Sequence, residues 1–184
     1  MAGSTNIDGA DIYDVLGQRI ASWTINNNGP AQITQYTYDA GNPLVEMNAS
    51  GQVTRVKLYG PAVDQVLASE STIPSEEGQG EGSGTVNWML SDNQGTVRDV
   101  VQQVFADGAW QTQVADHLSY TAFGSVAWQS SPSAQPRFDY TGKWTDPTTG
   151  LQLNARRWYD AVDQVFISRD PDDLSAGDTN LSRY

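Results

Sequence analysis

The sequence FDYTGKWTDPTTGLQLNARRWYDAVDQVFISRDP, which runs from Phe138 to Pro171, decides how this chain is expected to fold. Aromatic and β-branched residues alternate in it with Asp-Pro, Thr-Gly and Tyr-Asp pairs at short intervals. This spacing is typical of short strands separated by tight turns, because Gly, Asp and Pro supply the backbone conformations that turns need. The stretch therefore predicts β-structure.

The same alternation continues upstream, and helical periodicity is hard to find. Trp and Tyr, with 6 and 8 copies, outnumber the 4 Phe, which suits half-buried sheet faces. We expect an all-β chain of antiparallel hairpins. The strands predicted most clearly are Gln18–Ile25, Ile33–Tyr38, Gln52–Tyr59, Thr85–Leu90 and Thr96–Phe105.

A degenerate repeat appears when tyrosines at the ends of predicted strands are aligned. Each is followed by a turn, three of them through a Tyr-Asp pair; the four tyrosines are Tyr13, Tyr38, Tyr120 and Tyr159. We expect the Asp carboxylate to accept hydrogen bonds from the turn backbone and a glycine to adopt the positive φ. Each hairpin would then stack on its neighbour.

Composition excludes several classes of function. The formal net charge of -12 repels nucleic acid and anionic membranes, and the acidity favours solubility, with a cation or a basic partner as the alternative. The chain has no Cys, which excludes disulfides, a thiolate nucleophile and Cys-ligated zinc. No apolar run has membrane-spanning length, and the first residues do not resemble an export signal. We expect no cofactor and no metal.

Residues 71–84, STIPSEEGQGEGSG, interrupt the pattern of strands. One aliphatic residue among three Glu and four Gly cannot bury enough surface to offset the entropy of ordering. We therefore expect a flexible acidic, Gly-rich loop within one domain of residues 1–184. The alternative is two parts of the sheet, 1–70 and 85–184.

The order of the motifs resembles the YD-repeat or Rhs-repeat proteins, and specifically their C-terminal Rhs-repeat-associated core region. Upstream, Leu90–Arg98 and Ser119–Val126 are similar to two further elements of that family. The motifs that carry the resemblance most strongly are Tyr140–Gly142, Asp146–Leu151, Ala155–Asp160 and Phe166–Pro171.

The resemblance implies a curved or spiralling antiparallel sheet of YD-type hairpins, a fragment of the hollow shell of bacterial polymorphic toxins, the C component of insecticidal toxin complexes and teneurins. It implies a structural or interaction module of a secreted or cell-surface protein, bacterial-like, whose shell encloses or presents a C-terminal segment. Its partners would be the remainder of a larger chain, its own sheet edges, or a protein or glycan at a cell surface.

The family core also resembles an intramolecular aspartic protease, which needs two neighbouring carboxylates that share a proton. By resemblance, the catalytic residues would be Asp170 and Asp178, with Arg169 as the charge partner of Asp170. This sequence departs from the family pattern, since Gln164-Val165 replace the usual Gly-Arg. The alternative is that Asp170 opens a turn and that Asp178 is a solvated loop residue.

Exposed tryptophans offer a third hypothesis, a carbohydrate-binding β domain. Aromatic faces on a sheet stack on sugar rings, and Trp88, Trp144 and Trp158 are the candidate binding residues. Packing of the same rings in a sheet core is the alternative. The single histidine, His117, lies in a predicted strand without a nucleophile motif, so a Ser-His-Asp triad is rejected.

Overall fold

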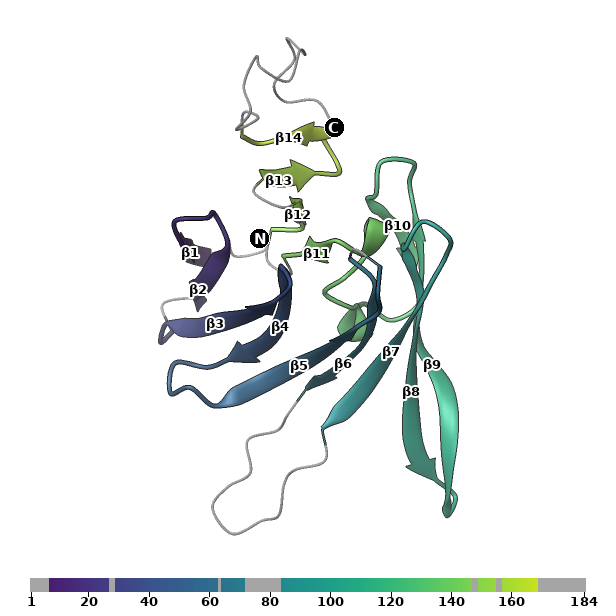
Figure 1. Cartoon of the computed structure of the whole chain (residues 1–184). Helices are drawn as coiled ribbons and strands as arrows, with labels where there is room; N and C mark the ends of the chain where they lie inside the picture. Colours follow the sequence, from purple (N-terminus) through teal and green to yellow (C-terminus); the bar gives the residue numbers. More distant parts are fainter. Residues whose placement is uncertain are drawn as a thin grey trace, which may run out of the picture. The chain divides into compact units, whose positions relative to one another are not determined.

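The computed structural model describes residues 7–26, 29–62, 64–71, 84–146, 149–154 and 157–168. Strands dominate, as the sequence predicted. Ten of them form an open antiparallel sheet in which each strand pairs with the next one along the chain. They are β1 (Ile7–Tyr13), β2 (Arg19–Asn26), β3 (Gln32–Asp39), β4 (Asn42–Met47), β5 (Val53–Tyr59), β6 (Val66–Ser71), β7 (Thr85–Ser91), β8 (Val97–Ala106), β9 (Ala109–Tyr120) and β10 (Val126–Gln129) (Figure 1).

A second antiparallel sheet contains four short strands, again in chain order. Two single-turn 3₁₀ helices, η1 (Pro132–Ala134) and η2 (Tyr140–Gly142), precede it. The strands are β11 (Trp144–Thr145), β12 (Gln152–Asn154), β13 (Arg157–Asp160) and β14 (Val165–Phe166). The all-β class and the hairpin meander are confirmed, and each of the five strands predicted most clearly lies within two residues of an observed one.

Four turns of the large sheet share one hydrogen-bond pattern. The first residue donates its N–H to the carbonyl oxygen of the fifth at 2.8–2.9 Å, and the glycine at the fourth position donates back to the first at 3.0–3.1 Å. Each glycine has φ between +78° and +92°, a region that other residues avoid. The turns are Asp14–Gln18, Asn48–Gln52, Asp92–Thr96 and Thr121–Ser125.

The first side chain completes each turn. Asp14 Oδ1 accepts the N–H groups of Leu16 and Gln18 at 2.9 and 2.8 Å, and Asp92 Oδ1 accepts those of Gln94 and Thr96 at 2.9 and 3.1 Å. The predicted role of the Asp in the repeat is therefore confirmed at Asp14. The turn after Tyr38 differs, because its positive φ values fall on Ala40 and Gly41.

The contacts divide the chain into two compact units. One comprises Met1–Leu58 and Ala68–Val86, and the other comprises Tyr59–Leu67 and Asn87–Tyr184. The division runs through β6 and β7. Of the predicted flexible loop 71–84, only Ser71 and Gly84 lie within the described residues, so its flexibility stays a prediction, as does the choice between one domain and two.

Polar groups dominate the buried part of the first unit. Glu46 forms ion pairs with Lys57, whose Nζ is 2.8 Å from Glu46 Oε1, and with Arg55, whose Nε is 3.5 Å from Glu46 Oε2. Both Glu46 and Lys57 are almost fully buried. Buried Arg19 places its guanidinium 4.4 Å from the centre of the Tyr36 ring. Charges therefore lie inside this unit, each beside an opposite charge or an aromatic ring.

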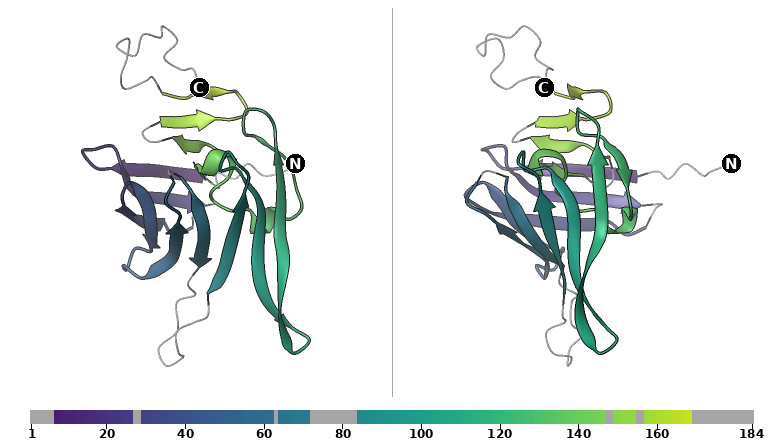
Figure 2. Two further views of the ribbon diagram at one scale, coloured as in Figure 1. Left: turned by 45° about the vertical axis from the view of Figure 1, so that its right-hand side comes forward. Right: turned by 90° about the vertical axis from the view of Figure 1, so that its right-hand side faces the viewer.

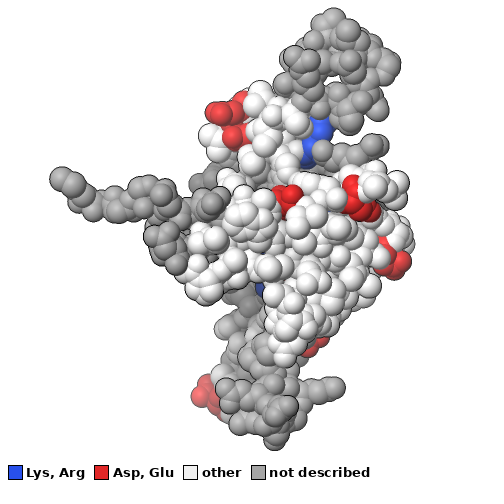
Figure 3. Space-filling view, turned by 90° about the vertical axis from the view of Figure 1, so that its left-hand side faces the viewer, with Lys and Arg blue, Asp and Glu red and all other residues white. Residues whose placement is uncertain are grey.

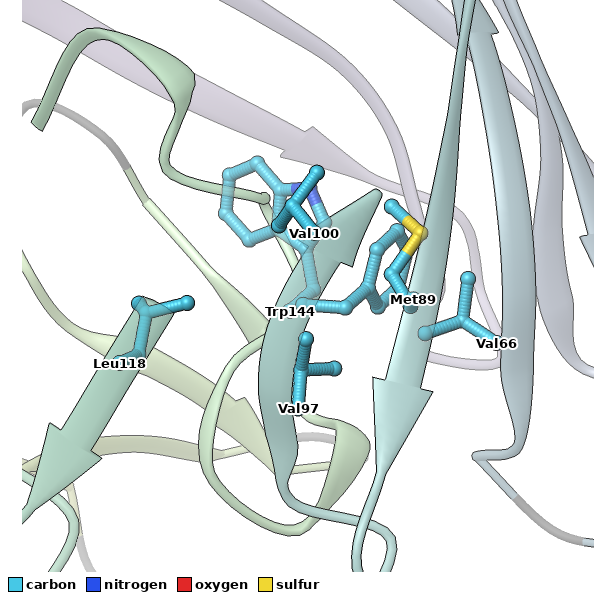
Figure 4. Close-up of a cluster of buried hydrophobic side chains, with 7 residues drawn as sticks. Val66, Met89, Val97, Val100, Leu118 and Trp144 are labelled. Atoms are coloured by element: carbon cyan, nitrogen blue, oxygen red, sulfur yellow. The ribbon is translucent and has the colours of Figure 1, made fainter. Parts of the chain in front are cut away.

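The second unit has an apolar core. Its side chains come from β6 to β9, from β11 and from the segment that leads into β11. Figure 4 shows Val97, Val100, Met89 and Trp144 close together, with Val66 and Leu118 on either side. Tyr59, Ala115, Tyr120, Leu153 and Trp158 pack around them. The buried residues are Val66, Met89, Val97, Val100, Leu118, Phe138 and Trp144. Both views in Figure 2 show η2 and β11 on one side of β7 to β9, which agrees with this packing.

Candidate functional site

The segment Asp139–Lys143, here called the clasp, contains the Tyr-Thr-Gly motif and lies between two turns of the second unit. Val97 donates its N–H to the carbonyl oxygen of Asp139 at 3.1 Å. The N–H of Thr141 donates to Thr96 Oγ1 at 3.0 Å. Lys143 forms an ion pair with Asp64, which lies in the turn between β5 and β6. The clasp thus joins the Asp92–Thr96 turn to the β5–β6 turn.

Gly142 shows why the motif requires glycine. Its φ is +69°, and a methyl group at this position would stand far inside van der Waals contact with the carbonyl oxygen of Asp64. The carbonyl oxygen of Gly95 would lie 3.4 Å from the same methyl group. Only a residue without a side chain allows the backbone to approach the two turns this closely.

A third turn, Thr121–Ser125, is held by side chains that follow in the chain. Tyr140 donates its hydroxyl to the carbonyl oxygen of Ala122 at 2.9 Å, and Tyr159 donates to that of Phe123 at 3.2 Å. Buried Gln152 donates to the carbonyl oxygen of Gly124 at 3.3 Å. The Tyr-Thr-Gly and Tyr-Asp motifs therefore hold the ends of sheet hairpins in place.

Two buried carboxyl groups lie beside the clasp. Asp116 on β9 is fully buried and accepts from Ser130 Oγ at 3.0 Å and from the Ser131 N–H at 2.7 Å. Asp139 is 2% exposed, and its Oδ2 accepts from the Gln135 side-chain amide at 3.1 Å. Among the described residues, neither Asp116 Oδ2 nor Asp139 Oδ1 has a hydrogen-bond partner.

The environment changes how Asp139 titrates. Burial, together with the negative charge of Asp116, raises the pKa of Asp139 to about 6, while Thr145 and Gln135 act in the opposite direction. Burial also raises the pKa of Tyr120, whose hydroxyl has no hydrogen-bond partner among the described residues.

A pocket of about 320 Å³ is lined by Asp139 together with Pro132, Ser133, Gln135, Pro136, Arg137, Thr145, Asp146 and Gly150. A carboxyl group that titrates near neutral pH beside a pocket is a typical acid–base candidate. Asp139 lines the pocket, but its Oδ1 has almost no exposed surface, so only a small part of the carboxyl group faces the cavity.

The predicted protease residues cannot be compared with this geometry. Arg169, Asp170 and Asp178 lie outside the described residues, so the carboxylate pair stays a prediction. Nearby, Asp160 Oδ1 accepts the N–H groups of Val162 and Asp163 at 2.8 and 3.1 Å. This is the turn role that the repeat predicted for the Tyr-Asp pair.

The three candidate tryptophans lie in different environments. Trp88 on β7 is 46% exposed, whereas Trp144 is buried in the apolar core and Trp158 packs against it. The Trp144 and Trp158 rings meet edge to face with centroids 5.9 Å apart. This environment favours the packing alternative for both residues, and glycan binding stays a prediction.

His117 lies in a strand, β9, as predicted, and its Nδ1 is 2.6 Å from Asp99 Oδ1. Within the described ranges, no group of three or more acidic or histidine side chains has a metal-binding arrangement. In the same part of the chain, no helix has the length and hydropathy that a membrane span requires. Figure 3 shows acidic side chains in separate patches on the face that it displays.

Sequence reasoning did not identify Asp116, Asp139 or Lys143 as residues with a role. Asp139 lies between Phe138 and Tyr140. An acidic residue between two aromatic residues was the feature of the sequence that could have marked Asp139 as a residue with a role. The alternation of a strand suggests that such a residue points to solvent, but here the chain leaves the strand pattern and enters η2.

Comparison with known proteins shows that this chain is similar to short parts of much longer proteins. No family model matches the chain. The tRNA3(Ser)-specific nuclease WapA of Bacillus spizizenii is 28% identical over 169 residues, which are 91% of this chain and 6% of WapA.

Two solved structures of toxin complexes also match this chain over nearly its whole length. The TcdB2–TccC3 complex matches with a TM-score of 0.67 and 18% identity over 95% of this chain, and the Photorhabdus luminescens Tc holotoxin pore matches with 0.66 and 17% over all of it. In both cases the match covers 8% of the other chain. The chain thus spans less than a tenth of each of these three proteins. Its fold is that of a short part of these toxin-complex chains.

Proposed function

We propose that this chain is a structural module that forms part of the β-sheet wall of an Rhs-type shell, which encloses or presents a C-terminal segment. The observation that carries the proposal is the open ten-stranded meander, which matches a short part of much longer toxin-complex chains over nearly its whole length. The proposal includes the Rhs-repeat-associated core assignment and a secreted or cell-surface location in a bacterium.

The clasp supports this role. A wall that surrounds another segment needs hairpins whose ends do not splay apart. In the second unit, three turns are fixed by hydrogen bonds, an ion pair and close backbone approach to residues 139–159. The motifs of the family resemblance therefore have a structural task here that requires no catalytic chemistry.

The two ends of the large sheet supply the means of attachment. Within the described residues, β1 pairs only with β2, and β10 pairs only with β9. Each end strand therefore presents N–H and C=O groups that lack a strand partner, and such edges pair readily with further strands. We infer that their partners are neighbouring strands of a longer Rhs-like chain or, in the isolated module, a second copy.

Sedimentation of the isolated chain at increasing concentration tests this attachment. The wild type is expected to self-associate, and the double variant Ala10→Lys/Ala127→Lys is expected to remain monomeric, because a charge on each exposed edge opposes strand pairing. Gln103→Lys is the matched control, since Gln103 is exposed on β8, an interior strand. A wild type that stays monomeric throughout would contradict edge pairing.

The autoprotease assignment stays a separate proposal that rests on resemblance. Its test is a chain extended beyond Tyr184, in which self-cleavage releases a discrete C-terminal fragment and Asp170→Asn abolishes the release. A fragment that appears equally in Asp170→Asn would remove Asp170 from that role.

A further inference from the structure

The β7–β8–β9 region has a face opposite the apolar core, and apolar side chains cover part of it. Trp88 on β7 pairs with Val101 on β8, which pairs with Val114 on β9. Alternate residues of a strand point to opposite faces. Since Met89 and Val100 point into the core, the row Trp88–Val101–Val114 lies on the other face.

Two further rows follow on the same face toward the tip of the β8–β9 hairpin. Gln103 pairs with Thr112, and Phe105 pairs with Trp110. The rings of Phe105 and Trp110 meet edge to face with centroids 5.5 Å apart. Figures 1 and 2 show that this hairpin extends beyond the end of β7. We call the three rows together the Trp88–Trp110 face.

The aromatic residues of this face are open to solvent. Trp88 is 46% exposed, Trp110 is 67% exposed and Phe105 is 63% exposed. Large aromatic side chains are rarely left this open without a function, because their burial contributes strongly to folding and binding. The face is therefore a candidate binding surface.

The small number of charged side chains on the Trp88–Trp110 face indicates which class of ligand fits it. Between Val100 and Ala115 the only charged side chain is Asp107, at the hairpin turn, and no Lys or Arg occurs between Arg98 and Arg137. An anionic ligand would therefore find no Lys or Arg on this face. In the row next to Trp88, the carboxylate of Asp99 already contacts His117, so a strongly basic ligand would find Asp107 at the hairpin turn as its other carboxylate. Amide and hydroxyl groups, from Gln103 and Thr112, supply the polar contacts instead.

The distance between the rows that contain Trp88 and Trp110 limits the shape of a ligand that contacts both rings. The row that contains Val101 and the row that contains Phe105 are four residues apart along β8, which corresponds to roughly 13 Å. Trp88 and Trp110 thus lie at the two ends of one face, with a row of hydrogen-bonding side chains between them. A ligand that uses both rings must be extended, with apolar patches and hydroxyl groups in alternation.

We infer that the Trp88–Trp110 face binds a neutral, extended polysaccharide. Trp88 and Trp110 stack on the C–H surfaces of separate sugar rings, and Gln103 and Thr112 hydrogen-bond to hydroxyl groups between them. This site replaces Trp144 and Trp158 as the place where a glycan would bind, since those two rings pack in the core. The inference does not depend on the shell proposal.

Sedimentation of the whole chain with insoluble cellulose and chitin, and calorimetric titration with cello- and chito-oligosaccharides, test this site. The wild type is expected to bind one of these glycans. Trp88→Ala and Trp110→Ala should each weaken binding roughly tenfold, which corresponds to the loss of one aromatic stacking contact. Both side chains are exposed, so the midpoints of unfolding should stay close to that of the wild type.

Trp128→Ala is the matched control. Trp128 on β10 is 56% exposed, but its ring lies against His117, beyond the rows that form the face. Its replacement should leave glycan binding unchanged. Absence of wild-type binding to either polysaccharide, or binding that survives both Trp88→Ala and Trp110→Ala, would overturn the inference. So would binding to phosphatidylcholine vesicles in place of the glycans.

Discussion

The two units of the chain bury their interiors by opposite means. In the first, Glu46, Lys57 and Arg19 are buried, and each lies beside an opposite charge or an aromatic ring. In the second, seven apolar side chains form one cluster that includes Trp144 and Phe138. Both use the same hairpin pattern, so the pattern of strands and turns does not determine what the interior is made of.

The difference follows from how each kind of interior is stabilised. Apolar burial is non-directional and grows with area, so it tolerates many arrangements of side chains. Buried charges are stable only with a well-placed partner, because their desolvation is costly. The first unit should therefore be sensitive to the removal of single charges, and the second to the removal of volume.

Trp144→Ala should give the largest effect. The side chain is 5% exposed and belongs to the apolar cluster, so its truncation should lower the free energy of unfolding by about 4 kcal/mol. Denaturant unfolding followed by fluorescence measures this. Trp128→Ala, an exposed tryptophan, should change stability by less than about 0.5 kcal/mol. Equal losses in the two variants would show that Trp144 does not support a core.

Glu46→Gln should be the most damaging single charge substitution. It leaves the ammonium of Lys57 buried without this carboxylate, which should cost about 3 kcal/mol. The double variant Glu46→Met/Lys57→Met should regain most of that loss, since Arg55 is partly exposed and can reach water. A double variant as unstable as Glu46→Gln would argue that geometry other than charge pairing dominates in this unit.

Asp139→Asn should show how much one buried charge lowers the free energy of unfolding of the second unit. The folded-state pKa of about 6 lies above the ordinary 3.8, so the folded protein holds its proton more tightly than the unfolded chain. Stability therefore falls as pH rises from about 4 to about 6. Asn carries no charge, and the variant should be more stable than the wild type by about 3 kcal/mol well above pH 6.

Below about pH 3 the two proteins should have the same stability, because Asp139 is then protonated in both the folded and the unfolded state. Thermal unfolding over this pH range provides the measurement. A stability difference that does not change with pH would exclude titration of Asp139 as its cause.

Gln164→Gly should stabilise the chain slightly. Gln164 adopts φ +62°, where the resemblance places a glycine, so the substitution relieves backbone strain and should stabilise the chain by about 0.5 kcal/mol. Calorimetry can detect the small rise in melting temperature. A fall in melting temperature would indicate that the Gln164 side chain contributes a contact that outweighs the strain.

Local chemistry made part of this structure predictable. Turn residues such as Asp14 and Gly17 act within five residues, so the sequence alone indicates the hairpins and the strands between them. The resemblance pointed to Tyr140–Gly142 as a motif but not to its contacts with Thr96 and Asp64, which lie 45 or more residues away along the chain.

The sequence did not show which side chains of the strands are buried. Lys57 and Glu46 occupy strand positions where charged residues normally face solvent, and Trp88 and Trp144 both lie on strands although only Trp144 is in the core. Which face of a strand is covered depends on the segment that packs on it, and that segment is distant in the chain. For the same reason, the sequence did not indicate that the carboxyl groups of Asp116 and Asp139 are buried.

The central claim is that the clasp locks the turns of the second unit by close backbone approach at Gly142. The difference in free energy of unfolding between Gly142→Ala and Gly108→Ala tests it most directly. Both glycines have positive φ, +69° and +78°, but a methyl group at Gly108 meets no atom within 4 Å. Gly108→Ala should cost about 1 kcal/mol, and Gly142→Ala at least about 1 kcal/mol more. Equal losses would contradict the claim.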